Sequence, residues 1–121
     1  MPNCTFDPVA VVVDWLDACR ARHLDDLLDL YDAKAPFRCA CEGLYQGRDE
    51  LTRYWSTRLE RAVPHAFSLA DLAPDDYGVN PGIVLDYVAY DGTPVRMRFQ
   101  FTKTGKIAAS FCSRSRSVAG G

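Results

Sequence analysis

The sequence has no long hydrophobic run. Its longest apolar stretch is Val9–Val13, whereas about 20 apolar residues are needed to cross a bilayer as a helix. No basic segment precedes this stretch, so the sequence predicts neither a membrane anchor nor a signal peptide. We therefore expect a cytoplasmic protein.

No charge of one sign dominates the composition. The 14 lysines and arginines are nearly balanced by 16 aspartates and glutamates, for a net charge of -2. Proteins that bind nucleic acid or acidic membranes usually carry a basic patch or stripe, so neither partner is expected. The chain has 121 residues, 48% of them hydrophobic. This is enough for one domain with a core that needs no disulfide or metal.

The sequence has few of the patterns that hold metals or cofactors. Its five cysteines are an odd number, and without a secretory segment they are expected to be reduced thiols. Cys39 and Cys41 are separated by one residue, and no second cysteine pair follows to complete four zinc ligands. There is no glycine-rich phosphate loop. We therefore expect no metal site and no cofactor.

Helical patterns occupy the first half of the chain. Asp7 followed by Pro8 is typical of an N-cap and a first helical residue. Apolar residues then recur at helical spacing in three segments, which predicts helices over residues 8–22 and 48–61 and, between them, a helix that carries the apolar stripe from Leu24 to Tyr31. Pro36 ends the middle one of these helices, because the residue before a proline is pushed out of the helical conformation.

Strand patterns dominate the second half. After a short predicted strand at 37–41, Gly43 and Gly47 bracket a predicted loop. Beyond Pro64, strands are expected over 67–72, 83–90, 95–102 and 107–113. Helices followed by strands favour an α+β domain with an antiparallel sheet over alternating βαβ units. We assign residues 1–113 to a single domain and 114–121, which are rich in serine, arginine and glycine, to a flexible tail.

The order of these elements resembles the NTF2-like superfamily, which includes ketosteroid isomerases and SnoaL-like polyketide cyclases. The segments that carry the resemblance are VVDWL at 12–16, HLDDLLDLY at 23–31, GLYQGRDEL at 43–51 and FQFTKTGKI at 99–107. The resemblance covers nearly the whole chain. It implies a cystatin-like α+β cone, in which three N-terminal helices pack on a curved, mainly antiparallel sheet around an apolar pocket.

The catalytic groups of ketosteroid isomerases are missing from the matching positions. The resemblance puts Cys39, Trp15 and Met97 where those enzymes have a carboxylate base, a tyrosine and a protonated aspartate. A thiol in an apolar cavity is hard to ionise, an indole is a weak hydrogen-bond donor, and a thioether donates no hydrogen bond. The resemblance therefore implies that this chain lacks the isomerase mechanism.

Asp86 is the best acid–base candidate in the sequence. The Asp-Gly pair at 91–92 is typical of a two-residue hairpin loop, which would place Asp86 opposite Met97. Directly opposed residues share one face of a sheet, so Asp86 would then lie in the apolar pocket and could exchange protons with a substrate. One more loop residue would instead place it opposite Arg98, on the outer face in an exposed salt bridge.

Two functions remain open on the sequence alone. The first is a non-catalytic protein that binds a small hydrophobic molecule in the pocket, and its expected ligand-binding residues are Trp15, Cys39, Tyr54, Trp55, Met97 and Phe99. The second is a SnoaL-like or isomerase-like enzyme that moves protons on a small carbonyl or cyclic substrate, with Asp86 as the catalytic residue. The loss of the matched catalytic positions favours the first.

A homodimer is the expected assembly. The two-residue hairpin loop leaves a largely apolar set of side chains on the outer face of the sheet, beside two arginines: Ile83, Leu85, Tyr87 and Ala89, with Arg96 and Arg98. So much apolar surface is rarely left exposed to water. In the superfamily that the chain resembles, this face commonly packs against a second copy, and the arginines would rim the interface.

Overall fold

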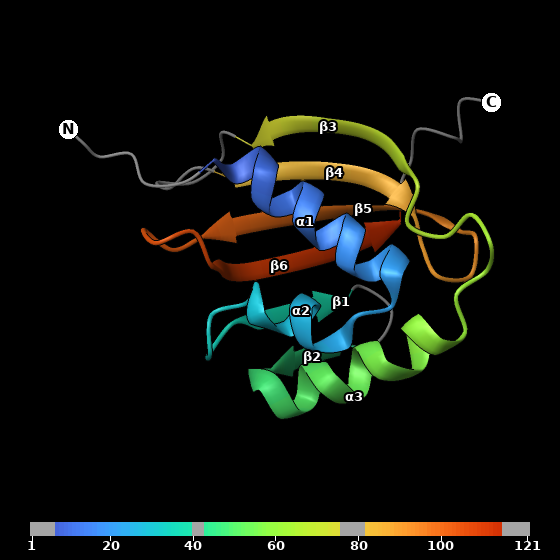
Figure 1. The fold of residues 1–121 in the computed structure, drawn as a ribbon. Helices are drawn as coiled ribbons and strands as arrows, with labels where there is room; N and C mark the ends of the chain where they lie inside the picture. Colours follow the sequence, from blue (N-terminus) through green and yellow to red (C-terminus); the bar gives the residue numbers. More distant parts are fainter. Residues whose placement is uncertain (1–6, 40–42, 76–81, 115–121) are drawn as a thin grey trace.

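The computed structural model describes residues 7–39, 43–75 and 82–114. Helices α1 (Pro8–Ala21), α2 (Leu24–Asp29) and α3 (Gly47–Glu60) lie on one side of a curved six-stranded sheet (Figure 1). The strands are β1 (Pro36–Cys39), β2 (Gly43–Gln46), β3 (Leu69–Asp75), β4 (Gly82–Val88), β5 (Pro94–Phe101) and β6 (Ile107–Arg114). The predicted α+β class is confirmed.

The sheet is mixed rather than wholly antiparallel. Its strand order is β2-β1-β6-β5-β4-β3, and β1 runs parallel to β6 while the other neighbours are antiparallel. This parallel pair brings together residues that are far apart along the chain: Phe37 lies opposite Ser110, and Cys39 lies opposite Cys112. The predicted tail beyond β6 lies outside the described residues.

The segment between the two glycines is a strand, so the predicted loop over Gly43 and Gly47 is wrong. Residues 43–46 form β2 and pair with β1. Both glycines have positive φ angles, 101° and 86°, a conformation that glycine adopts without steric cost. They mark the two ends of the short strand, and α3 begins at the second of them.

The first helix begins where the sequence predicts. The Asp7 carboxylate accepts a hydrogen bond from the Val9 backbone N–H at 3.0 Å, and Pro8 is the first helical residue. The helix ends before Arg22, which has a left-handed φ of 61°. In the part of the chain that the structure describes, no helix is long and apolar enough to cross a membrane.

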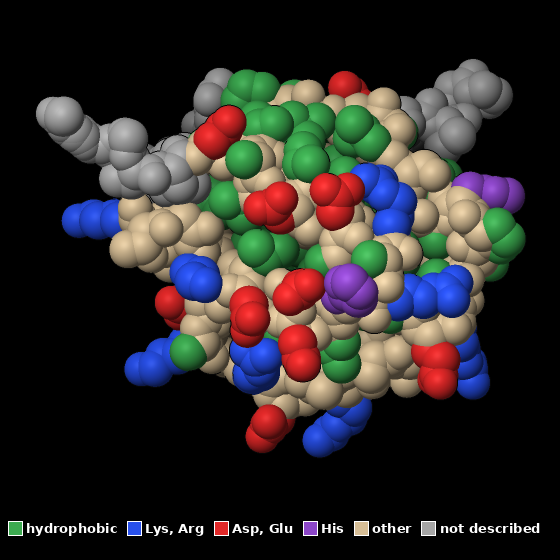
Figure 2. Space-filling model, viewed as in Figure 1, with side chains coloured by type: hydrophobic (Ala, Val, Ile, Leu, Met, Phe, Trp, Pro, Cys, Tyr) green, Lys and Arg blue, Asp and Glu red, His purple; other side chains and the backbone are tan. Residues whose placement is uncertain are grey.

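Charged side chains of both signs are interspersed on the face formed by the helices (Figure 2). The aspartates of α2 are solvent-exposed, and Asp29 pairs with Arg48 of α3 at 3.0 Å. The aspartates of α2 therefore belong to a solvated helix surface, which an exposed ion pair joins to α3.

Aromatic rings fill the space between the helices and the sheet. Trp15 of α1 is completely buried, and its ring makes edge-to-face contacts with four other rings: Trp55, Phe67, Tyr87 and Phe99, with centroid separations of 5.3–6.4 Å. Its indole Nε1–H donates a hydrogen bond to the Tyr31 hydroxyl at 3.1 Å. One residue of α1 thus links α3, the sheet and the segment that follows α2.

The loop between β4 and β5 has three residues, so the predicted two-residue loop is wrong. Ala89 pairs with Thr93 through a 2.8 Å hydrogen bond from the Ala89 N–H to the Thr93 carbonyl. Gly92 has a φ of 89° and donates its N–H to the Ala89 carbonyl at 3.0 Å. A left-handed glycine at the end of a three-residue hairpin loop is a common alternative to the two-residue form.

This loop places Asp86 on the outer face of the sheet. Asp86 lies opposite Arg96, and Leu85 lies opposite Met97. The predicted position of Asp86 in the pocket is therefore wrong. Its carboxylate instead forms a bidentate ion pair with Arg96, with Nε–Oδ1 and Nη2–Oδ2 distances of 2.8 and 3.0 Å. The alternative register correctly anticipated an outer-face salt bridge, but with Arg98 as the partner.

The same change reverses the two faces of β4. Ile83, Leu85 and Tyr87, which were expected on the outer face, are buried in the core. A shift of one residue has this effect because side chains alternate along a strand. The apolar surface that suggested a homodimer is thus already covered by the helices, and the dimer itself stays a prediction.

We expect the Asp86–Arg96 pair to contribute little to stability. The Arg96 side chain is 41% exposed, although that of Asp86 is only 12% exposed, and ion pairs that stay in contact with water contribute about 0.2–1 kcal/mol. A double-mutant cycle with Asp86→Asn and Arg96→Gln, followed by urea unfolding, should give a coupling energy in that range. The coupling should decrease at ~1 M salt, where screening acts over about 3 Å. A coupling that is several times larger and insensitive to salt would contradict this expectation.

Candidate functional site

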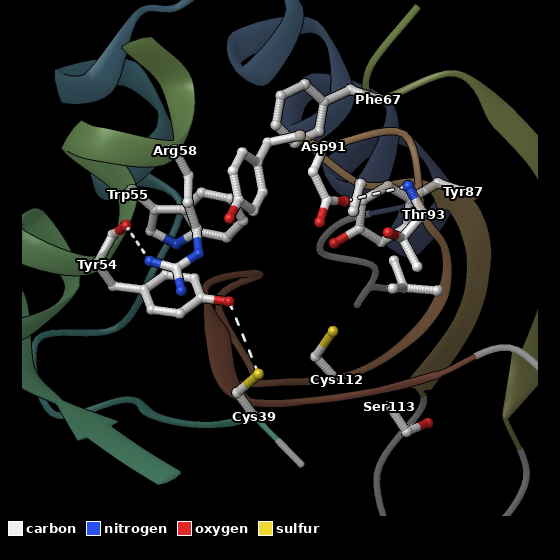
Figure 3. Close-up of a pocket in the computed structure, with 13 residues that line it drawn as sticks. Cys39, Tyr54, Trp55, Arg58, Phe67, Tyr87, Asp91, Thr93, Cys112 and Ser113 are labelled. Atoms are coloured by element: carbon white, nitrogen blue, oxygen red, sulfur yellow. Dashed lines mark hydrogen bonds between the residues drawn. The ribbon is translucent and has the colours of Figure 1, made fainter. Parts of the chain in front are cut away.

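A cavity of about 240 Å³ opens between α3 and the β4–β5 hairpin (Figure 3). Three parts of the fold supply most of its walls, and Phe67, from the segment between α3 and β3, adds to them. The three parts are α3 with Tyr54, Trp55 and Arg58, the β1–β6 pair with Cys39 and Cys112, and the β4–β5 hairpin with Tyr87, Tyr90, Asp91, Thr93 and Val95. Most of these side chains are aromatic or apolar, and the polar groups among them are few.

Two phenols in this cavity are neutral hydrogen-bonding groups. Burial raises the pKa of Tyr54 and of Tyr87 well above the ordinary tyrosine value, because water no longer solvates the phenolate. The Tyr54 hydroxyl lies 3.9 Å from the Cys39 sulfur. At neutral pH each phenol can donate a hydrogen bond to a ligand oxygen or nitrogen, but neither can act as a phenolate base.

Arg58 places a positive charge on the same wall. Its guanidinium carbon lies 3.7 Å from the ring centroid of Tyr54 and 5.5 Å from that of Tyr90, distances at which a cation is attracted to an aromatic ring. Its Nη1 also donates to the Tyr54 backbone carbonyl at 3.0 Å. The guanidinium is therefore held in place before any ligand arrives.

Asp91 is brought to the cavity by the three-residue hairpin loop. Its carboxylate accepts a hydrogen bond from the Thr93 backbone N–H at 3.1 Å. The side chain is exposed to solvent, so it lies at the mouth of the cavity rather than in its apolar interior.

No model of a protein family matches the sequence, and no curated protein matches it. Solved structures do match. A SnoaL-like protein of unknown function from Burkholderia thailandensis superposes with a TM-score of 0.74 at 18% identity, covering 94% of this chain and 99% of that one. An NTF2-like protein of unknown function from Pseudomonas putida has a TM-score of 0.67 at 16% identity, covering 87% and 82% of the two chains. The protein has the NTF2-like fold.

An enzyme is also among the structural neighbours. SalBIII, an epoxide hydrolase/cyclase-like enzyme in pyran ring formation in the polyether salinomycin, has a TM-score of 0.66 at 14% identity, covering 91% of this chain and 92% of that one. At such identities the likeness establishes the NTF2-like fold alone, since this fold supports more than one function.

The structure brings together only part of the residue set that the sequence suggested. Cys39, Tyr54 and Trp55 line the cavity of the NTF2-like fold. Trp15, Met97 and Phe99 are completely buried in the core and do not line it. Asp86 lies on the opposite face of the sheet. The predicted ligand contacts of the first three residues stay predictions, whereas the structure gives the other four no place in the cavity.

Sequence reasoning missed several lining residues. Arg58 lies four residues after Tyr54 on the same face of α3, and this spacing was a usable signal. Tyr87 and Cys112 gave no such signal, because their direction depends on strand register. Within the described ranges no three side chains of the His, Cys, Asp or Glu types gather as metal ligands.

Proposed function

We propose that the protein binds a small molecule with a ring-shaped apolar body and one hydrogen-bond-accepting group in the cavity beside α3. The volume of about 240 Å³ is below the roughly 300–1,000 Å³ of sites for drug-sized ligands. A ligand of one or two rings fits this volume.

The convergence of Tyr54 and Tyr87 on an aromatic cavity is the observation that carries this proposal. Aromatic walls bind an apolar ring through burial and edge-to-face contacts. Two neutral phenols in the same walls supply donors at defined positions, and such placed polar groups set the orientation of a ligand. Arg58 adds a positive charge beside them, which favours an acceptor that carries partial or full negative charge.

Catalysis through Asp86 is not part of this proposal. Its carboxylate faces away from the cavity and is bound to Arg96. The acid–base reaction that depended on it has thus lost its catalytic group, and the binding function is the one that the described residues support.

Two probes of matched shape test the binding function. We expect 2-acetylnaphthalene to bind more tightly than 2-ethylnaphthalene, because only the ketone accepts a hydrogen bond. A net hydrogen bond contributes about 0.5–1.5 kcal/mol, which corresponds to at most about a tenfold difference in Kd. Tyr54→Phe or Tyr87→Phe should remove most of this difference while leaving the affinity for 2-ethylnaphthalene nearly unchanged. Isothermal titration calorimetry or ligand-observed NMR measures both affinities.

A pair of tryptophan variants locates the site. Ala89→Trp places a large ring in the cavity wall and should abolish binding of both probes. Val88→Trp, on the neighbouring position that faces outward, should leave binding unchanged. Binding that survives Ala89→Trp, or no binding of either probe to the unmodified protein, would contradict the proposed function.

A further inference from the structure

We propose that Cys39 and Cys112 form a two-thiolate site for a soft, monovalent metal ion of the Cu(I) type. The two cysteines lie directly opposite each other on the parallel strands β1 and β6. Both line the cavity, and Figure 3 shows both sulfur atoms directed into the same open space. The inference goes beyond the proposed ligand binding and does not depend on it.

The strand spacing suits one ion shared between two sulfurs. Neighbouring strands lie about 4.8 Å apart, and opposed side chains on one face leave the sheet in the same direction. A metal–thiolate bond is about 2.3 Å long, so two such bonds nearly in line span roughly the strand spacing. An ion can therefore bind both sulfurs without moving either strand.

The number of donors selects the kind of ion. A structural zinc ion needs four protein ligands, and the described residues bring no group of three such side chains together. Thiolates select soft ions such as Cu(I), which is also stable with two ligands. The pairing of these two thiols therefore favours a two-coordinate soft ion over zinc.

The surroundings also suit the charge of the complex. Each thiol loses its proton to solvent when the ion binds, so two thiolates and one monovalent cation carry a net charge of -1. Arg58 lines the same cavity and supplies a positive charge. The Tyr54 hydroxyl lies 3.9 Å from the Cys39 sulfur and can donate to the thiolate. No electron is transferred, since the ion enters and remains as Cu(I).

Cys19 is a space-filling cysteine and differs in its surroundings from Cys39 and Cys112. It is completely buried on the core face of α1, does not line the cavity, and its pKa is raised by burial. Cys39 and Cys112 instead both line the cavity and lie opposite each other on paired strands. Cys19 therefore serves as the matched control.

Anaerobic titration with Cu(I) against a chromogenic Cu(I) chelator tests the site. The background carries Cys4→Ser and Cys41→Ser, which removes the two cysteines outside the described residues. We expect one ion per chain, at least 100-fold weaker binding in Cys39→Ser and in Cys112→Ser, and unchanged binding in Cys19→Ala. Alanine variants at 39 and 112, checked for folding by near-ultraviolet circular dichroism, separate loss of a ligand from loss of structure.

Three results would overturn the proposal. These are the absence of stoichiometric binding in the background protein, binding that survives replacement of either cavity cysteine in a folded variant, and binding that disappears with Cys19→Ala in a folded variant. Loss of Cu(I) binding in folded Cys39→Ala and Cys112→Ala, measured with no organic ligand present, would support the thiol site independently of the proposed ligand binding.

Discussion

Replacing Trp15 with alanine is expected to lower the free energy of unfolding by about 3–5 kcal/mol, the usual cost of removing a large buried aromatic side chain. Native domains are stable by only about 5–15 kcal/mol, so this single change removes much of the stability. Trp15 is completely buried and makes ring contacts with residues of α3 and of the sheet. Its loss leaves a cavity where these layers meet.

Two control variants separate the contributions of Trp15. Tyr31→Phe removes the acceptor of the indole N–H and should cost about 1–3 kcal/mol, the range for a buried polar group left unpaired. Val13→Ala changes a residue of the same helix that is 41% exposed and should cost about 0.5 kcal/mol or less. Urea unfolding followed by circular dichroism measures all three. Similar losses in Trp15→Ala and Val13→Ala would show that Trp15 is not central to the core.

The start of α1 could be predicted because its signals are local. Asp7 and Pro8 act on the backbone within one helical turn. The apolar spacing that follows can be recognised without knowing which part of the fold the helix packs against. The same holds for the apolar stripe of α3. The cap and the periodicity depend on the chemistry of neighbouring residues, which the sequence displays directly.

The position of Asp86 could not be predicted because it depends on the length of one loop. The Asp-Gly pair at 91–92 occurs in both two-residue and three-residue hairpins. The structure has the longer loop, with Gly92 in the left-handed conformation. A difference of one residue moves every side chain of β4 to the other face, which exchanged Asp86 for Tyr87 on the inner face.

The thiol pair was equally hidden in the sequence. Cys39 and Cys112 are far apart along the chain and meet only because β1 runs parallel to β6. The order of helices and strands predicted an antiparallel sheet, in which this contact has no counterpart. Pairing between distant strands is a tertiary property, and no local residue pattern reports it.

Raising the pH above about 10, the ordinary pKa of tyrosine, is expected to destabilise the protein steeply. Burial raises the pKa of Tyr31, Tyr54 and Tyr87 well above this value in the folded protein, whereas in the unfolded chain all three titrate near it. Above that pH the unfolded chain has lost protons that the folded protein still holds. Unfolding therefore releases protons, and the free energy of unfolding falls as pH rises.

The expected slope of the free energy of unfolding against pH follows from the number of buried tyrosines. One tyrosine contributes about 1.4 kcal/mol per pH unit, and three contribute about 4 kcal/mol per pH unit. Cys19, whose pKa is also raised by burial, acts in the same direction, so the measurement is made in Cys19→Ala. Urea unfolding at several pH values above about 10 gives the slope, and near-ultraviolet absorbance reports phenolate formation.

Tyr54→Phe should reduce the slope by about 1.4 kcal/mol per pH unit. Titration of all the tyrosines with an ordinary pKa of about 10, without loss of native circular dichroism, would show that these phenols are accessible to water. This result would remove the basis for treating Tyr54 and Tyr87 as neutral donors in the cavity.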